Sequence, residues 1–167
     1  MKSSEAAPKG ESKNINDEKH IKATRITEFE ERIIEIKRVS KKIKGGNAIG
    51  FAVLVVVGNR NGKVGYGYGK AQNVADAIGK AVAAAKKNIY DVKISGKTIA
   101  HEVNAKVGAS RIMLRPAPEG TGVIAGGPVR IVMEMAGIKN VSSKVLGSNN
   151  KLLNVRCAIQ ALQKLKK

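Results

Sequence analysis

Residues 61–71 read NGKVGYGYGKA, a glycine-rich stretch with a lysine near its end, as phosphate-binding loops have. A Walker A loop ending at Lys70 would need a glycine where Val64 stands and a Mg²⁺-binding Ser or Thr where Ala71 stands. The dinucleotide pattern GxGxxG fails too, because its last glycine falls on Lys70 or Gln72. The stretch therefore does not predict a nucleotide-binding loop.

Strand alternation explains the glycines better, because successive side chains of a strand point to opposite faces. One face then carries Tyr66 and Tyr68. The other face is bare backbone, formed by Gly65, Gly67 and Gly69. Either a packed helix or a nucleic-acid backbone can approach such a face closely, and the sequence leaves both readings open. Lys63 and Lys70 bracket the strand and supply positive charge at its ends.

The other residues with catalytic potential are scattered along the chain. The histidines are His20 and His101, and no spacing of Cys or His resembles a metal site. Cys157 falls within a predicted helix and is expected beside the core rather than as a nucleophile. Glu119 is expected as a loop cap or salt-bridge partner. We therefore expect no enzymatic activity, no metal, no cofactor and no small-molecule substrate.

The charge balance gives a stronger signal, because 31 Lys and Arg oppose 13 Asp and Glu, for a net charge of +18. The first 24 residues hold five lysines and four acidic residues, so all but one of these charges fall on the rest. Self-repulsion of this size favours a polyanionic partner, RNA or DNA. A membrane surface is the weaker alternative, because no basic amphipathic helix carries Trp or Phe.

The segment SKKIKGGN is the first candidate for phosphate contact. It forms either an ordinary β-turn or a flexible basic loop that places cations on phosphates. The residues concerned are Arg38, Lys41, Lys42 and Lys44, with Gly45 and Gly46 as the turn. Aromatic residues make up only 3% of the chain and are mostly expected in the core, which disfavours stacking on single strands. Folded or double-stranded RNA suits such a chain better.

The surrounding patterns predict an α+β protein with two small two-layer domains. Residues 1–27 are polar and mixed in charge and are expected to be a disordered extension. Residues 28–93 predict the order β-β-β-α. The segment 28–40 could start as a helix or a strand, and the alternation of apolar Ile34 and Ile36 with charged neighbours favours a strand. Further strands are expected over 48–58, a β-branched run, and over 63–69. The helix over 73–88 is expected to start at Asn73 as its cap. Its predicted buried stripe is Val74, Ile78, Ala81, Val82 and Ala85.

Residues 94–167 predict a second domain in the order β-β-α-β-α. A strand pair over 98–108 and 110–118 comes first, and Pro116 and Pro118 end it. A helix over 128–137 starts with Pro128 and stops at Gly137, and a strand over 140–147 follows. The closing helix, within 148–167, has a predicted buried side of Leu152, Val155, Ile159 and Leu162.

Five segments, in this order, resemble the family of the bacterial fifth protein of the small ribosomal subunit: RVSKKIKGGN, VVVGNRNGKVGYGYGKA, EGTGVIAGGPVR, AGIKNVSSKVLGS and NVRCAIQAL. The resemblance runs from about Phe29 to Leu165. It implies a first domain like a double-stranded-RNA-binding domain and a second with left-handed β-α-β topology. The polar extension before Phe29 is longer than in many members and the chain stops soon after the last predicted helix, so no role carries over to the two ends.

The resemblance also implies a structural, non-enzymatic component of the cytoplasmic small ribosomal subunit. Such proteins bind small-subunit rRNA between body and head, contact the fourth and eighth small-subunit proteins, help line the mRNA entry channel and influence decoding accuracy. The rRNA-binding residues we expect are Arg38, Lys41, Lys42, Lys44, Gly45, Gly46, Lys63, Lys70, Lys86 and Lys87. Gly122 and Arg130 match the contact with the fourth protein. A free duplex-RNA chaperone and a nucleotide-binding kinase-like domain built on GTGVIAGG are the alternatives.

Overall fold

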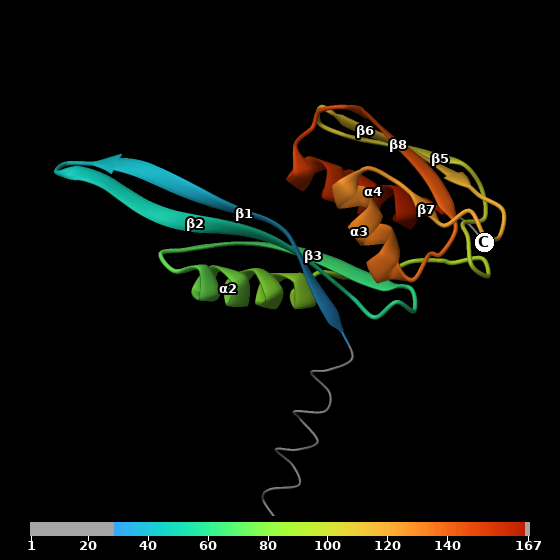
Figure 1. Ribbon diagram of the computed structural model, residues 1–167, viewed down its shortest axis with the longest axis horizontal. Coiled ribbons are helices and arrows are strands. Elements are labelled where there is room, and N and C mark those ends of the chain that lie inside the picture. The colour runs from blue at the N-terminus through green and yellow to red at the C-terminus, as the bar shows by residue number, and fades with distance from the viewer. Residues whose placement is uncertain (1–28, 166–167) are drawn as a thin grey trace, which may run out of the picture.

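The computed structural model describes residues 29–165, which form two domains, each combining a four-stranded sheet with helices (Figure 1). The strand order is β1-β2-β3-β4 in the first sheet and β5-β6-β8-β7 in the second. The predicted α+β class with two small sheet-and-helix domains is confirmed. The predicted extension over 1–27 lies outside the described residues.

The first domain is an antiparallel meander with one helix on its face. Strands β1 (Glu30–Ile43), β2 (Gly46–Gly58) and β3 (Lys63–Ala71) pair in sequence, and α2 (Val74–Lys87) follows. A short strand, β4 (Ile89–Asp91), then pairs with β3 and was not predicted. The alternating pattern that favoured a strand over a helix at 28–40 predicted the right element.

Helix α2 lies directly on the bare face of β3. Its buried residues are Ala77, Ala81 and Ala85, one per turn, and all three have zero exposed area. A Cβ at Gly65 would stand 2.6 Å from the Asn88 carbonyl oxygen, and one at Gly67 would overlap the Ala81 carbonyl oxygen. A packed helix, and not a nucleic-acid backbone, therefore occupies this face.

Two details of α2 differ from the sequence prediction. Val74, Ile78 and Val82 are only half-buried. The close approach of α2 to the glycines of β3 leaves room only for alanine side chains, so the larger side chains lie at the sides of the contact. Asn73 is the N-cap residue, but its side chain accepts no bond from the helix backbone. Its Nδ2 instead donates to Asp76 Oδ2 at 3.4 Å.

The second domain begins with β5 (Val103–Val107) and β6 (Ser110–Pro116), which form the predicted strand pair and are antiparallel. Strand β5 is shorter than the predicted 98–108, because residues 98–102 belong to the connection between the domains. Strand β7 (Val123–Ile124), α3 (Gly127–Ala136) and β8 (Val141–Gly147) follow, with β7 and β8 parallel. Strand β7 lies in the glycine-rich segment before α3 and was not predicted, because a strand of two residues has no recognisable pattern.

The helices of the second domain follow the sequence patterns closely. Helix α3 has proline in its first turn and ends at Gly137, whose φ of 95° places it in the left-handed region that favours glycine. The last helix, α4 (Lys151–Gln163), buries Val155, Ile159 and Leu162 as predicted, with Leu152 half-buried beside them.

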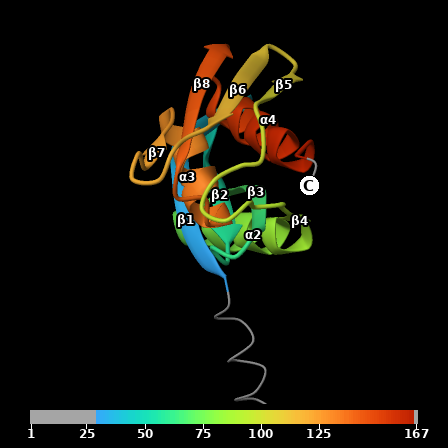
Figure 2. The same cartoon turned by 90° about the vertical axis from the view of Figure 1, so that its right-hand side faces the viewer.

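The two domains share one core, so the molecule is built in four layers: α2, the first sheet, α3 with α4, and the second sheet (Figures 1 and 2). Leu54, Val56 and Val64 of the first sheet belong to the same buried cluster as Met135 and Leu162 of the second domain. Burial on both faces from Ala52 onward explains why the second half of β2, residues 51–57, is an unbroken apolar run.

The connection between the domains runs from Val92 to Glu102, and the predicted boundary between residues 93 and 94 falls within it. Val92 and Ile99 are buried in the shared core. We keep this boundary as a proposal. No helix in residues 29–165 is both long and apolar enough to cross a membrane.

Candidate nucleic-acid interface

The distal parts of β1 and β2 project from the body as a ribbon, here residues 38–51 (Figure 1). The ribbon is two-stranded beyond Phe51, which makes the last pair with β3. Of the two alternatives for SKKIKGGN, the flexible basic loop is wrong, because the segment is a turn between paired strands. Pairing continues from Ser40 opposite Ile49 to Ile43 opposite Gly46, leaving Lys44 and Gly45 at the tip. Cross-strand hydrogen bonds pair the inward-facing backbone groups of this segment, and Lys44 and Gly45 make the turn. Gly46, the first residue of β2, has φ 148°, which favours glycine.

Cations occupy both faces of the ribbon. Arg38 is opposite Phe51, which packs in the α2 cluster, so Arg38 and Lys42 share the α2 face. Lys41 lies on the other face and Lys44 at the tip. All four are exposed and none has an acidic partner among residues 29–165.

The ribbon is also free of acidic residues in its sequence. No Asp or Glu occurs between Glu35 and Asp76, a span that includes both distal strands. Val39, Ile43 and Ile49 stand among the cations and are 36%, 57% and 45% exposed. Such a surface offers charge for phosphates and apolar contacts for the rest of a nucleic-acid groove.

Lys70 joins the ribbon cations in space. It lines a hollow of about 530 Å³ together with Lys41, Lys80, Val39 and Ile49. Its Nζ lies 5.5 Å from the centre of the Tyr68 ring. Tyr68 is 44% exposed, so the expectation that most aromatic rings are in the core fails for this one.

Three other predicted rRNA-binding residues lie away from the ribbon. Lys63 starts β3, at the opposite end of that strand from Lys70. Lys86 Nζ lies 2.8 Å from Glu31 Oε1, so a carboxylate already balances its charge. Lys87 is exposed at the end of α2, where the helix dipole favours a cation.

The predicted protein-contact residues, Gly122 and Arg130, lie around the start of α3. The Gly122 N–H donates to Asn140 Oδ1 at 3.1 Å, and the Gly122 carbonyl accepts from the Val141 N–H at 3.1 Å. Arg130 is exposed on α3, and its Nε lies 2.8 Å from Glu134 Oε1. Gly122 is thus held by backbone and amide bonds, while Arg130 faces solvent.

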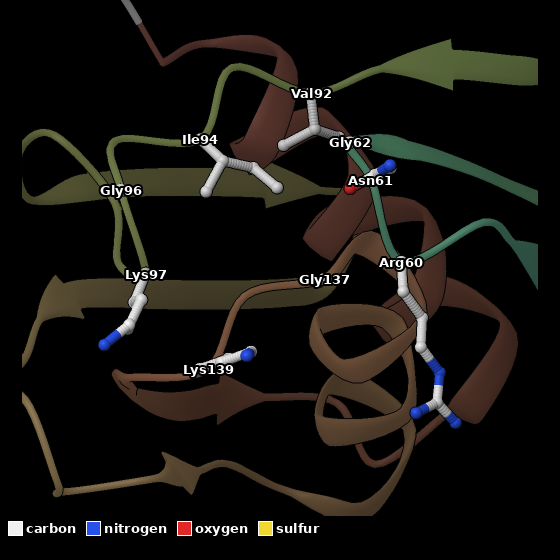
Figure 3. A pocket seen from close by; sticks show the side chains of 9 residues that line it. All are labelled: Arg60, Asn61, Gly62, Val92, Ile94, Gly96, Lys97, Gly137 and Lys139. Atoms are coloured by element: carbon white, nitrogen blue, oxygen red, sulfur yellow. The ribbon is translucent and has the colours of Figure 1, made fainter.

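A basic pocket that the sequence did not predict lies at the domain junction. This pocket of about 510 Å³ is lined by Arg60, Lys97 and Lys139 from three separate segments, together with Asn61 and Gly137. Their separation along the chain leaves no local signal. In Figure 3 the Arg60 side chain extends away from the two lysines. Two of the cations have carboxylate partners, since Arg60 pairs with Glu30 at 2.6 Å and Lys97 with Glu119 at 3.4 Å. The latter pair agrees with the predicted salt-bridge role of Glu119.

Backbone contacts lock this junction. The Arg60 N–H donates to the Met135 carbonyl at 3.0 Å and the Gly62 N–H donates to the Ala136 carbonyl at 2.9 Å. A Cβ at Gly137 would overlap the Arg60 carbonyl oxygen. The turn between β2 and β3 is therefore seated on the end of α3, which fixes the two domains relative to each other.

Side chains add two links between β1, β3 and α4. Lys151 Nζ lies 2.9 Å from Glu35 Oε1, and hydrogen bonding to Lys151, aided by Lys37, lowers the pKa of Glu35. Arg156 Nε donates to the Tyr66 hydroxyl at 2.8 Å, which raises the pKa of Arg156 above its usual range. Both links join the first sheet to the second domain.

No group of three or more His, Cys, Asp or Glu in residues 29–165 is placed to hold a metal ion. Cys157 is fully buried, and its Sγ donates to the Ala105 carbonyl at 3.3 Å, as expected for a core residue. His101 is exposed in the connection between the domains. Burial and the bond to Ala105 give Cys157 a packing role in the core.

Comparison with known proteins agrees with the two-domain architecture. Residues 29–93 match the family described as ribosomal protein S5, N-terminal domain, and residues 105–167 match ribosomal protein S5, C-terminal domain. Small ribosomal subunit protein uS5 of Campylobacter jejuni strain 81-176 is 59% identical over 139 residues, covering 83% of this chain and 95% of that protein. The uS5 proteins of strains 81116 and RM1221 give the same values. The chain therefore belongs to the ribosomal protein S5 family.

Proposed function

We propose that this chain is a structural constituent of the cytoplasmic small ribosomal subunit, and that its ribbon binds small-subunit rRNA between body and head. The observation that carries the proposal is the ribbon itself: it is exposed, projects from the body and has cations without acidic partners on both faces and at its tip. Phosphate contacts made this way supply affinity and register but little sequence reading.

The rRNA contacts that we propose centre on Arg38, Lys41, Lys42, Lys44 and Lys70, with Gly45 and Gly46 keeping the tip narrow. Gly45 has open space around it, so a phosphate can approach its backbone. Lys63, Lys86 and Lys87 are weaker candidates, because they lie away from the ribbon and Lys86 is paired.

The finer roles rest on family resemblance. We propose that the surface around Gly122 and Arg130 contacts the fourth small-subunit protein, that the eighth is also a neighbour, and that the chain lies near the mRNA entry channel and influences decoding accuracy. The exposure of Arg130 supports a contact there. We propose no enzymatic role, because the chain belongs to a family of structural ribosomal proteins.

The main test uses the ribbon tip. We expect Lys42→Glu with Lys44→Glu to weaken binding to small-subunit rRNA by about tenfold and to lower the logarithmic salt slope by roughly 2, one unit per phosphate contact. The fold should survive, since both side chains are exposed. Lys93→Glu with Lys139→Glu makes the same charge change at two exposed lysines outside the proposed rRNA contacts and serves as the matched control. Equal loss in both pairs would contradict a specific role for the ribbon.

Gradient sedimentation separates the ribosomal role from that of a free duplex-RNA chaperone. A subunit constituent co-migrates with small subunits at about one copy each. A chain found mainly at the top of the gradient, in cells that are assembling ribosomes, would favour the chaperone.

A further inference from the structure

The outer face of the second sheet is a second cationic surface that none of the predicted sites includes. Helices α3 and α4 cover the inner face of this sheet and lie between the two sheets, so the outer face points away from the first domain (Figures 1 and 2). Burial alternates along the strands accordingly: Ala105, Ile112 and Leu114 are buried, while Lys106 and Arg111 are exposed.

Register places the outward side chains in rows across three strands. Lys106 of β5 is opposite Arg111 of β6, which is opposite Leu146 of β8. The next row holds Asn104, Met113 and Lys144. Neighbouring strands are about 4.8 Å apart, so Lys106, Arg111 and Lys144 form one compact cluster, here called the sheet cluster.

The sheet cluster has no acidic partner in the described chain. From residue 94 onward the sequence contains only Glu102, Glu119 and Glu134 as acidic residues. Each is already paired: Glu102 with Arg115 at 3.0 Å, Glu119 with Lys97 at 3.4 Å and Glu134 with Arg130 at 2.8 Å. The cluster is therefore left with an unbalanced charge of +3, which favours an external anion.

The shape of the surface also suits RNA. Lys106 and Arg111 line a hollow of about 490 Å³ with Asn104, Leu146 and Lys164. Leu146 is 42% exposed and offers apolar contact, while the Asn104 amide can both donate and accept hydrogen bonds. No aromatic ring lies on these three strands, so the surface does not favour base stacking. It favours contacts with the phosphates and riboses of a helical RNA.

We propose that the sheet cluster is a second phosphate-contacting surface for rRNA, separate from the ribbon, so that one chain holds two segments of RNA. This inference rests on the proposed rRNA-binding function and extends it to the second domain. The layers between the two surfaces are rigidly joined at the domain junction, so the distance between the two RNA segments is set by the fold.

The test measures binding of the full chain to small-subunit rRNA over a range of salt concentrations. We expect Arg111→Glu with Lys144→Glu to lower affinity by about tenfold and the salt slope by roughly 2 relative to the control pair, Lys93→Glu with Lys139→Glu. Combined with the ribbon-tip pair, the fold-changes should multiply, because the sites are distant and share no partner. Arg111→Gln with Lys144→Gln should give a smaller loss in the same direction, and thermal unfolding checks that each variant is folded.

The outcomes distinguish this inference from the proposed function. If the wild-type chain does not prefer its rRNA over an unrelated duplex, the proposed function fails. If the ribbon-tip pair weakens binding but the sheet-cluster pairs match the control, the inference alone is overturned. A sheet-cluster pair that binds free rRNA normally but does not enter small subunits would also overturn it, by assigning the surface to a protein.

Discussion

At the scale of single residues, three glycines set the distance between α2 and β3. Gly65, Gly67 and Gly69 face the helix, and a Cβ on any of them would meet helix backbone. Backbone cannot move aside as the far end of a side chain can, so the helix or the strand would have to shift. The stability of the first domain therefore requires that these three positions carry no side chain.

Gly67→Ala should destabilise the protein by roughly 1–3 kcal/mol, the usual cost of overpacking a core. Gly79→Ala is the matched control, because Gly79 lies in α2 with nothing within 4 Å of a Cβ. This second change should stabilise by about 0.5–1 kcal/mol through helix propensity. Urea unfolding of both variants checks the pair, and equal stabilities would refute our account of the bare face.

At the scale of elements, the ribbon adds little to the core. Its distal residues are exposed, and the buried residues of β2 begin at Ala52. The first part of the 14-residue strand β1 therefore belongs to the body of the first domain, and the rest of the strand projects from it. Such an element can lose its end without loss of the fold.

Replacing residues 40–49 by a two-residue Asn-Gly turn tests this division. Val39 and Gly50 are paired, so a type I′ turn can close the shortened hairpin there. We expect the melting temperature to change by only a few degrees while affinity for rRNA falls more than in the tip pair. Collapse of the fold on shortening would show that the distal ribbon is structural, and unchanged affinity would show that it does not bind rRNA.

At the scale of the whole molecule, the domains form one body because a shared core, backbone hydrogen bonds and side-chain contacts connect them. The ion pair of Glu35 with Lys151 is one such link, with the Glu35 side chain 21% exposed. A carboxyl whose pKa is lowered in the folded state stabilises that state above its ordinary pKa of 4.5, and the contribution disappears as the pH falls through the lowered value.

Glu35→Gln should therefore cost about 0.5–1 kcal/mol at pH 7, the range of partly exposed ion pairs. At pH 3 or below, the wild type and the variant should approach each other in stability, since protonation removes the charge in the wild type as well. Urea unfolding at both pH values measures this. Glu119→Gln is the control, because the Glu119 side chain is 79% exposed and its loss should matter little at either pH. A Glu35→Gln deficit that persists undiminished at low pH would contradict the ion-pair explanation.

Local patterns in the sequence were enough to predict most elements. Alternation gave β1, the β-branched run gave β2, and Pro128 and Gly137 bounded α3, because these signals act between neighbouring residues. They could not predict β4 or β7, whose two or three residues pair only because a longer strand lies alongside. The net charge similarly predicted a polyanionic partner without showing where it would bind.

Composition and periodicity by themselves determined the fold class, the two domains and the basic character of the chain, since these depend on residue type and spacing alone. Tertiary structure alone decided that a helix fills the glycine face, that the basic segment is a paired ribbon, and which cations remain unbalanced. Lys86 and Lys42 look alike in the sequence, yet only Lys86 has a glutamate folded against it. Which charges are left for RNA therefore depends on contacts between residues distant along the chain.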